Sequence, residues 1–352
     1  KKYWGYDSFR PLQKSVIESV LAGRDTLALM PTGGGKSITY QIPALAMKGI
    51  CVVVTPLISL MKDQVDSLRK RKIMAQAVHS GMTSREIDAI LDNCVYGDYK
   101  FLYVSPERLE TDIFRARFER MNISMIAVDE AHCISQWGYD FRPAYLNIQK
   151  IRPLAPDAVV LAVTATATPV VVADIQQKLG FKKENVFTMS FARHNISYIV
   201  RECEDKRSMI LKIIYSLNNG VGIIYCRTRK DCEELSAFLV SSGIKSDFYH
   251  GGLSYPMRSS KQESWIKEQI KVVVATNAFG MGIDKHNVRY VIHHDTPDTL
   301  EAYYQEAGRV GRDGHTSYAV MLSNKNDNAS ASRRIEGQYP SIAEIKQIYG
   351  LI

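Results

Sequence analysis

The most informative run of residues in this chain reads Thr26-Leu27-Ala28-Leu29-Met30-Pro31-Thr32-Gly33-Gly34-Gly35-Lys36-Ser37. Its first five residues are mostly apolar and predict a buried strand, and the residues after Ser37 have a helical pattern. Between the two, the glycines allow a tight turn whose backbone N–H groups point at phosphate oxygens. Lys36 is then expected to reach the terminal phosphates, and Ser37 to hold Mg²⁺ where the helix begins. The alternative is a glycine-rich strand-to-helix turn with an exposed lysine.

Strand-like and helix-like segments alternate along the chain. Apolar, β-rich runs occupy residues 26–30, 51–55, 101–104, 124–129 and 158–163, and the pattern restarts with residues 221–226, 246–249, 271–275, 289–293 and 317–322. Continuous apolar strands separated by amphipathic helical patterns, such as residues 57–70 and 84–93, predict a parallel sheet covered on both faces. The sequence therefore predicts two doubly wound α/β domains in tandem, with a ligand cleft between them and a polar linker at residues 193–207.

Composition narrows the class of protein. The chain has 352 residues, of which 45% are hydrophobic, so a disordered or fibrous protein is excluded and about two domains are expected. Lys and Arg number 45 and Asp and Glu 37, giving a net charge of +8. This charge suits a polyanionic partner such as nucleic acid, although many basic proteins merely have a solvated basic face.

Targeting and cysteine patterns point to a reducing compartment. The longest apolar run, residues 158–173, is too short and too polar for a membrane span, and the chain start lacks the apolar segment of a secretory signal. We therefore expect neither membrane insertion nor secretion. Because the first residue is not Met, we also expect a piece excised from a longer protein. No two of the six cysteines form a C-x-x-C pair, so no zinc site is expected.

A pair of carboxylates ends another predicted strand. The sequence there reads Asp129-Glu130-Ala131-His132. A carboxylate at this position, Asp129, is suited to hold the Mg²⁺ that Ser37 binds, and Glu130 to polarise an attacking water. Asp-Glu pairs are common on solvated loops, but this one follows a parallel strand, as the phosphate-binding turn does.

Two arginines stand three residues apart in the second α/β region. Arg309 and Arg312 lie within Gln305-Glu306-Ala307-Gly308-Arg309-Val310-Gly311-Arg312-Asp313-Gly314. On one helix face they are placed to stabilise charge on a transferring phosphoryl group. The alternative is an ordinary surface pair, which the flanking glycines make less attractive because they weaken a helix.

Together these motifs resemble the RecQ family of superfamily 2 helicases, from Trp4 to about Leu322. Residues 5–13, 55–64, 105–109, 129–132, 163–168, 224–229, 249–253, 275–285 and 305–314 follow the order of the family's motifs. The resemblance implies two RecA-like domains with an ATP cleft between them. An ATP-binding domain would cover residues 1–194, a C-terminal helicase domain residues 195–325, and the start of a truncated or divergent region residues 326–352.

The resemblance also implies roles in binding Mg-ATP. Gln13 would read the adenine edge and Tyr6 and Arg10 would sandwich the ring, with Leu12 standing where the family has Gly. Arg312 matches the arginine finger. The implied cofactor-binding residues are Tyr6, Arg10, Gln13, Thr32, Gly33, Gly34, Gly35, Lys36, Ser37 and Asp284; the catalytic ones are Lys36, Asp129, Glu130, Arg309 and Arg312; the Mg²⁺ ligands are Ser37 and Asp129.

An aromatic loop after the carboxylates resembles a segment peculiar to RecQ enzymes. It implies that Trp137 and Phe141 stack on bases and that Arg142 binds phosphate or a base. Tyr139 stands where the family usually has His, so the coupling between DNA and ATP sites is expected to differ. Further DNA-binding residues implied by the resemblance are Ser105, Arg108, Arg227, Thr228 and Thr276.

The resemblance implies an ATP-dependent 3′-to-5′ DNA helicase core that couples Mg-ATP hydrolysis to movement on single-stranded DNA, in repair or recombination. Its partners would be single-stranded and partly duplex DNA, in the bacterial cytoplasm and nucleoid or in a nucleus. Two alternatives stay open: an RNA-directed translocase, and a nucleotide-gated DNA-binding module without turnover. A small-molecule kinase would not explain the second α/β region. RecQ enzymes commonly carry a zinc domain and a strand-separating winged helix after the last motif, whereas only residues 324–352 remain here after the region of resemblance. We therefore expect DNA-stimulated ATPase activity but weak unwinding.

Overall fold

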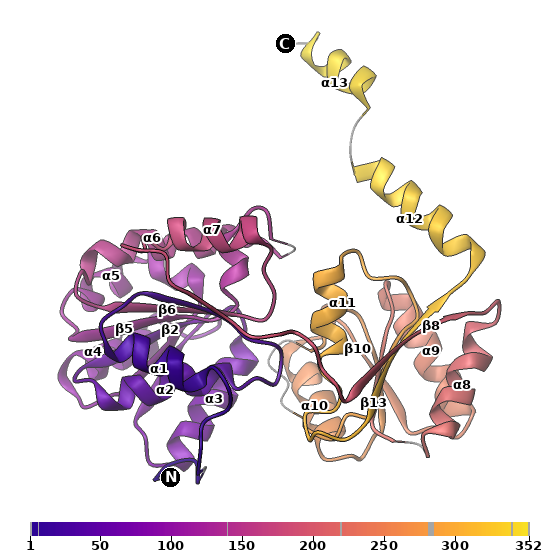
Figure 1. Ribbon diagram of the computed structural model, residues 1–352, viewed down its shortest axis with the longest axis horizontal. Helices are drawn as coiled ribbons and strands as arrows, with labels where there is room; N and C mark the ends of the chain where they lie inside the picture. The colour runs from indigo at the N-terminus through magenta and orange to yellow at the C-terminus, as the bar shows by residue number, and fades with distance from the viewer. Residues whose placement is uncertain are drawn as a thin grey trace. The chain divides into compact units, whose positions relative to one another are not determined.

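A computed structural model of the chain describes residues 2–5, 7–138, 140–218, 220–280, 285–338 and 341–350. The chain divides into two compact units, with unit 1 ending at Ala192 and unit 2 beginning at Arg193 (Figure 1). Each unit is built around one parallel sheet with helices on its faces. The predicted fold class, two tandem doubly wound α/β domains, is therefore confirmed.

Unit 1 alternates strands and helices, with short 3₁₀ turns named η. Its elements are α1 (Gln13–Leu21), β1 (Thr26–Leu29), α2 (Lys36–Ala46), β2 (Ile50–Val54), α3 (Ile58–Lys70), β3 (Ala75–Val78), α4 (Ser84–Tyr96), β4 (Phe101–Val104), η1 (Pro106–Glu110), α5 (Asp112–Phe118), β5 (Ile123–Val128), η2 (Ala131–Ile134), η3 (Pro143–Asn147), α6 (Ile148–Ile151), η4 (Arg152–Leu154), β6 (Val159–Thr164), α7 (Pro169–Lys178) and β7 (Val186–Thr188). Its strands lie in the order β3-β4-β2-β5-β6-β1-β7.

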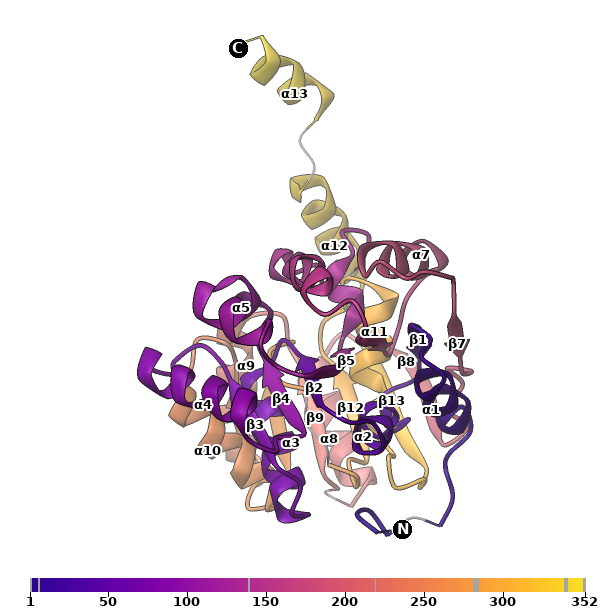
Figure 2. The same ribbon diagram turned by 90° about the vertical axis from the view of Figure 1, so that its left-hand side faces the viewer.

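Both faces of the unit 1 sheet are buried. Along β1, Leu27 and Leu29 pack with α4, α5, α6 and α7, whereas Ala28 and Met30 point to the opposite face and pack with α1, α2 and α3 (Figures 1 and 2). Successive side chains of a strand alternate between the two faces, so a strand covered on both sides must be apolar throughout. This requirement explains why the strands read as continuous apolar runs in the sequence.

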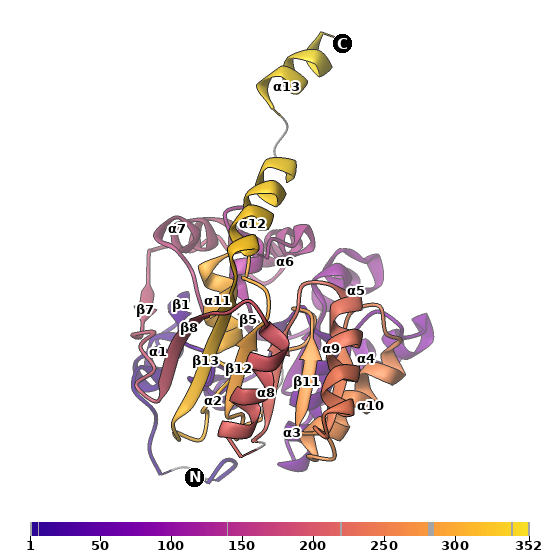
Figure 3. The same ribbon diagram turned by 90° about the vertical axis from the view of Figure 1, so that its right-hand side faces the viewer.

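Unit 2 repeats the pattern. Its elements are β8 (Ile196–Glu202), α8 (Lys206–Ser216), β9 (Gly222–Tyr225), α9 (Arg229–Ser241), β10 (Ser246–Tyr249), α10 (Tyr255–Ile266), β11 (Val272–Ala275), β12 (Tyr290–His293), α11 (Leu300–Ala307), β13 (Ser317–Ser323), α12 (Lys325–Gln338) and α13 (Ile342–Tyr349). Its strands lie in the order β10-β11-β9-β12-β13-β8. Helices α8 and α9 pack on one face of this sheet (Figure 3).

The predicted linker at residues 193–207 is wrong as a description of local structure. Its central residues form β8, which pairs in parallel with β13 from Ile196 to Glu202, and α8 begins at Lys206. It is an edge strand, and side chains such as those of Tyr198 and Val200 are exposed. An edge strand that is open to solvent carries polar residues, and this is why its composition resembled that of a linker.

The described helices include none with both the length and the apolar character that crossing a lipid bilayer requires.

Candidate active site

Three neighbouring strands of unit 1 bring the predicted catalytic residues to one edge of the sheet. Strand β6 lies between β1 and β5, and Thr164 at its end is level with Leu29 of β1. Carboxyl ends of parallel strands meet at the same sheet edge, where α/β proteins bind ligands. The phosphate-binding turn that follows β1 and the carboxylates that follow β5 therefore flank the end of β6.

The phosphate-binding turn has the backbone that its glycines predict. Gly35 is the N-cap of α2 and has a φ of 79°, in the left-handed region, and Lys36 begins the helix. A Cβ atom at Gly35 would lie 2.3 Å from Nε2 of Gln13, so a larger residue has no room there. The N-terminus of α2 has no acidic residue in its first turn, which suits a bound anion.

Lys36 and the carboxylates form one charged cluster. Nζ of Lys36 lies 3.7 Å from Oε1 of Glu130, and both side chains are largely buried. The Asp129 side chain is also buried, and burial, reinforced by repulsion from Glu130, raises its pKa to about 6. A divalent cation at Asp129 would relieve the repulsion between the two carboxylates. The carboxylate oxygens and the nearby Lys36 therefore fit a phosphate group that carries Mg²⁺.

The backbone at Glu130 is strained. Its φ of 47° places a residue other than glycine in the left-handed region. Conformations of this kind cost about 1–3 kcal/mol and persist where the surroundings impose them, often at functional sites. Here the amide N of Glu130 donates to Oδ1 of Asp129 at 3.0 Å, so the turn directs both carboxylates to the same region.

His132 connects the carboxylates to the end of β6. Its Nδ1 lies 2.8 Å from Oγ1 of Thr164 and 3.5 Å from Oε2 of Glu130. Burial lowers the pKa of His132 in spite of Glu130, which favours a neutral ring. The ring therefore joins two strand ends by hydrogen bonding. Both His132 and Thr164 lie within the family motifs, but the motifs alone imply no role for either residue.

Tyr145 is a residue that sequence reasoning missed. Its buried hydroxyl donates to the backbone O of Asp129 at 2.9 Å and joins the segment that follows β5 to η3. No spacing rule predicts a contact of this kind, because it depends on how η3 folds back onto β5.

The residues expected to hold the base lie against the phosphate-binding turn. Gln13 is buried, and its Nε2 donates to the backbone O of Gly34 at 3.3 Å and of Gly35 at 3.2 Å. The guanidinium of Arg10 donates to the backbone O of Gly33, and its amide N donates to Oε1 of Gln13 at 2.9 Å. These bonds support the turn from behind. Contact with adenine stays a prediction, and Tyr6 lies outside the described residues.

The two predicted arginines of unit 2 lie in the turns after α11, which ends at Ala307, and not on one helix face as expected; they also differ in burial. Arg309 is 5% exposed, and its guanidinium donates to the backbone O of Gly280. A Cβ atom at Gly280, whose φ is 141°, would lie 2.3 Å from Cζ of Arg309, so glycine is required there. Arg312 is partly exposed. Their roles in catalysis stay predictions, and Asp284 lies outside the described residues.

The aromatic loop presents one of its predicted DNA-binding side chains fully to solvent. Trp137 is 73% exposed, whereas Phe141 is partly buried with Nζ of Lys178 6.0 Å from its ring centroid. Arg142 pairs with Asp140 at 3.1 Å, and its amide N donates to the backbone O of Cys133 at 2.9 Å, which closes the loop. Tyr139 lies outside the described residues.

The other predicted DNA-binding residues are scattered over strand ends. Ser105 is 3% exposed, so its hydroxyl lies beneath the surface, whereas Arg108 is partly exposed and donates to the backbone O of His79 at 3.4 Å. In unit 2, Thr228 caps α9, Arg227 pairs with Asp298 at 2.9 Å, and Oγ1 of Thr276 accepts from Ala278 at 3.4 Å. All of these contacts with DNA stay predictions.

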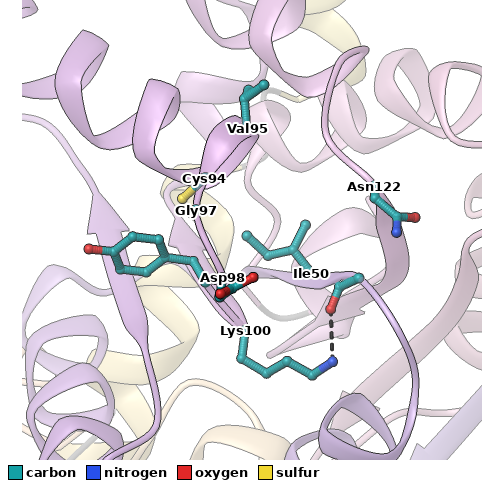
Figure 4. A pocket seen from close by; sticks show the side chains of 9 residues that line it. Ile50, Cys94, Val95, Gly97, Asp98, Lys100 and Asn122 are labelled. Carbon is teal, nitrogen blue, oxygen red and sulfur yellow. Dashed lines mark hydrogen bonds between the residues drawn. The ribbon is translucent and has the colours of Figure 1, made fainter.

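A pocket elsewhere in unit 1 is not the phosphate site. It lies where β2 and β4 begin, the sheet edge opposite to the phosphate-binding turn, and is lined by Gly49, Ile50, Cys94, Val95, Gly97, Asp98, Tyr99, Lys100 and Asn122 (Figure 4). Nζ of Lys100 donates to the backbone O of Gly49 at 2.9 Å, a bond drawn in Figure 4. No residue that the sequence predicts to be functional lines it.

The chain matches known families of helicase domains, in agreement with the cluster of Lys36, Asp129 and Glu130 at the strand ends. Residues 10–175 match the DEAD/DEAH box helicase family, and residues 205–314 match the helicase conserved C-terminal domain. The chain is 40% identical to the probable ATP-dependent DNA helicase RecS of Bacillus subtilis, covering 99% of this chain and 70% of that protein. It is 44% identical to the ATP-dependent DNA helicase RecQ of the same species, over 92% of this chain and 55% of that protein.

The chain belongs to the RecQ family of superfamily 2 helicases. It spans about half the length of the RecQ proteins of B. subtilis, Pasteurella multocida and Haemophilus influenzae that it matches, with 55%, 52% and 53% of each covered. The expected RecQ resemblance is thereby confirmed.

Solved structures with low sequence identity share the fold. Helicase Lhr of Mycobacterium smegmatis, bound to single-stranded DNA and AMP-PNP, aligns over 90% of this chain and 46% of its own with a TM-score of 0.74 and 19% identity. Dbp5 of Saccharomyces cerevisiae, bound to RNA and ADP BeF3, aligns over 94% of this chain and 88% of its own with a TM-score of 0.72 and 18% identity. One is bound to DNA and the other to RNA, so the fold does not choose between these partners.

Proposed function

We propose that this chain is the motor core of an ATP-dependent DNA helicase that hydrolyses Mg-ATP and moves 3′ to 5′ along single-stranded DNA, in repair or recombination. The observation that carries the proposal is the cluster of Lys36, Asp129 and Glu130 at one sheet edge, next to the start of α2. The RecQ and RecS relatives, named as ATP-dependent DNA helicases, support the choice of reaction.

Each group in unit 1 has a distinct task in this proposal. The N-terminus of α2 and Lys36 bind the terminal phosphates, and Ser37 and Asp129 hold the cation, which supplies Lewis-acid stabilisation of phosphate charge when bound. Glu130 orients a water and accepts its proton, and the ion pair with Lys36 keeps its carboxylate at the phosphate-binding turn. His132 contacts both Glu130 and Thr164 and so holds the Glu130 side chain near the end of β6.

Residues outside this cluster complete the proposal. Arg309 and Arg312 stabilise charge on the transferring phosphoryl group. Trp137 stacks on a base of the single strand, which its exposure permits. We propose residues 1–194 as the ATP-binding domain, residues 195–325 as the C-terminal helicase domain and residues 326–352 as the start of a divergent C-terminal region.

ATP turnover with and without nucleic acid tests the proposal. The purified chain is assayed with single-stranded DNA, with RNA of the same sequence, and with neither, and Glu130→Gln serves as the control for contaminating ATPases. We expect turnover that DNA stimulates more than RNA. Equal or stronger stimulation by RNA would favour an RNA-directed translocase, and no turnover despite DNA binding would favour a nucleotide-gated binding module.

The direction of movement needs a separate measurement. Streptavidin is bound to a biotin at either end of a single-stranded oligonucleotide, and its ATP-dependent displacement is followed. A motor that moves 3′ to 5′ displaces streptavidin faster from the 5′ end. Faster displacement from the 3′ end would reverse the proposed polarity and leave the ATPase assignment intact.

A further inference from the structure

Three metal-binding side chains meet at the carboxyl ends of β9 and β12 in unit 2. Cys226, His294 and Asp295 each offer a ligand atom, and these atoms all lie within 4.8 Å of one another. The cluster combines a thiol, an imidazole and a carboxylate. Neither the predicted ATP site nor the predicted DNA contacts use any of these three groups.

The sheet holds the cluster in place. Strands β9 and β12 are parallel neighbours with Tyr225 level with His293, so Cys226 and His294 are the next residues along each strand. The amide N of Cys226 donates to the backbone O of Ala275 at 2.8 Å, and that of His294 donates to the backbone O of Tyr225 at 2.9 Å. The ligand-bearing backbone is therefore fixed before any ion binds, which lowers the ordering cost of binding.

The Asp295 carboxylate is already turned towards the other ligands. Its Oδ2 lies 3.1 Å from Nδ1 of His294 and accepts a hydrogen bond from the amide N of Arg227 at 2.9 Å. The side chains of His294 and Asp295 are 23% and 28% exposed, whereas Cys226 is 4% exposed. An ion can reach the cluster from solvent, and the thiol is shielded from bulky reagents.

The ligand types select the class of ion. A thiolate together with imidazole and carboxylate suits Zn²⁺ and ions of similar size and softness, such as Co²⁺. Mg²⁺ prefers oxygen ligands in octahedral geometry, so the cation required by a phosphate site would not compete here. Three protein ligands leave one position of a tetrahedral site for water.

A second group of such residues, His132, Cys133 and Asp140 in unit 1, is a weaker candidate. Asp140 forms an ion pair with Arg142 at 3.1 Å, and His132 is bonded to Thr164. A cation there would have to displace Arg142 from Asp140, although the bond from Nδ1 of His132 to Thr164 would remain, because Nε2 of the ring faces Sγ of Cys133 at 3.7 Å. In unit 2, the ion pair of Asp295 is with His294, itself a ligand.

We propose that Cys226, His294 and Asp295 form a binding site for a Zn²⁺-class divalent cation. On binding, the Cys226 thiol releases its proton to solvent, a metal–sulfur bond forms, and the hydrogen bond between His294 and Asp295 gives way to bonds from each to the ion. The next residues, Arg227 and Thr228, are predicted to contact DNA. An ion at this site therefore fixes the base of that segment.

The spacing of the cysteines along the sequence does not predict this site. Zinc motifs are recognised by ligands that are close neighbours along the chain, such as C-x-x-C. Here the thiol and the imidazole come from strands that are distant in sequence and adjacent in the sheet. The expectation of no zinc therefore rested on a pattern that cannot detect a site of this kind.

Titration of the purified, reduced chain with Co²⁺ tests the site. We expect one Co²⁺ per chain with the near-ultraviolet charge-transfer absorption of a cobalt–thiolate bond, and loss of that absorption when Zn²⁺ is added. Cys226→Ser should abolish the band, and His294→Ala should weaken binding about tenfold or more, as losses around metal sites do. Asp295→Asn should also weaken it.

A matched control separates the site from adventitious binding. Cys203 is the more exposed thiol of unit 2 and lies outside the cluster, so Cys203→Ser should bind Co²⁺ as the unaltered chain does. Because Cys226 is buried, its variant carries a folding risk. His294→Ala at a partly exposed position avoids this, with circular dichroism as the check, and Zn²⁺ should raise the melting temperature of the unaltered chain more than that of His294→Ala.

The outcomes decide the proposal independently of ATPase activity. Absence of the charge-transfer band in the unaltered chain would overturn it. So would a band that survives in both Cys226→Ser and His294→Ala, which would place the ion elsewhere, including at Cys133, or a band lost in Cys203→Ser.

Discussion

Each unit has an aspartate just past the end of a central parallel strand: Asp129 follows β5 in unit 1, and Asp295 follows β12 in unit 2. The surroundings shift the pKa values of these two aspartates in opposite directions. In unit 1, burial and the neighbouring Glu130 raise the pKa of Asp129 to about 6. In unit 2, burial alone would raise the pKa of Asp295, but bonds from His294 and from the amide of Arg227 lower it to about 2. Unit 1 thus carries unfavourable electrostatics that unit 2 avoids.

This difference indicates that the carboxylates of unit 1 lower the free energy of unfolding. Carboxylates held together and buried, with a strained backbone at Glu130, are costly unless positive charge joins them. Perturbed groups of this kind gather at functional sites. The common architecture therefore does not mark the active site, and the local electrostatics do.

The largest loss of ATP turnover should come from a variant of unit 2. Such a loss would mean that unit 2, like unit 1, contributes to the chemistry, which weakens the contrast between the units. If Arg312 is an arginine finger, Arg312→Ala should lower DNA-stimulated ATP turnover by about 10³-fold or more. Arg312→Lys should recover only part of the loss, because lysine lacks the planar guanidinium. The measurement is the steady-state rate at saturating ATP. A loss below about tenfold would exclude a catalytic role for Arg312 and would leave the chemistry to the residues of unit 1.

Next in size is the loss of the proposed base in unit 1. Glu130→Gln should lower turnover by about 10²–10⁴-fold while nucleotide still binds, because the amide is similar in shape but cannot accept the proton. Lys36→Ala is the contrasting variant and should weaken binding itself. Fluorescent-nucleotide binding and turnover are measured on both. Normal turnover in Glu130→Gln would exclude the role of general base.

A direct test of the comparison replaces each aspartate by asparagine. Asp129→Asn should stabilise the ligand-free chain at pH 7 by on the order of 2 kcal/mol, because it removes the cost of an ionised buried carboxylate. Asp295→Asn should destabilise it, because a favourable carboxylate is lost. Urea unfolding at pH 7 measures both. The same sign for the two variants would refute the contrast.

The pH dependence has a defined sign. Since the pKa of Asp129 rises from 3.8 in its ordinary state to about 6 in the fold, the native protein binds the extra proton between these values. Its contribution to stability is greatest below about pH 4 and is lost as the pH rises through about 6. For Asp295, the contribution is present above about pH 4 and is lost as the pH falls through about 2. The stability of Asp129→Asn relative to the unaltered chain should therefore increase from pH 5 to pH 7.5.

The smallest expected effect concerns DNA affinity. Trp137→Ala should keep basal ATPase activity but lose DNA stimulation, and should weaken single-stranded DNA binding by about 1–3 kcal/mol, the value of one stacked base. Tyr96→Ala is a matched control, since Tyr96 is 71% exposed and Trp137 73% exposed, both in unit 1. Fluorescence anisotropy with a labelled oligonucleotide compares them. Equal losses in the two variants would argue against a specific role of the loop.

How far the sequence predicts this molecule depends on the signal. The central strands were predictable because burial on both faces makes them continuous apolar runs, as for β1 and β6. Strands β3, β7 and β8 carry polar side chains and gave no such signal. The charged cluster followed from motifs at strand ends. The bond from Tyr145 to Asp129 and the meeting of Cys226 with His294 depend on tertiary packing, which local spacing does not encode.

The aromatic loop is attached at both ends to the segment that follows β5. Its start continues from Glu130 through η2, Arg142 returns to Cys133, and Tyr145 holds the carbonyl of Asp129. Among the described residues, the loop is therefore closed by hydrogen bonds to the segment where it begins. We expect a base bound at the exposed indole of Trp137 to affect the position of the carboxylates through the backbone of η2 and the hydrogen bonds that close the loop.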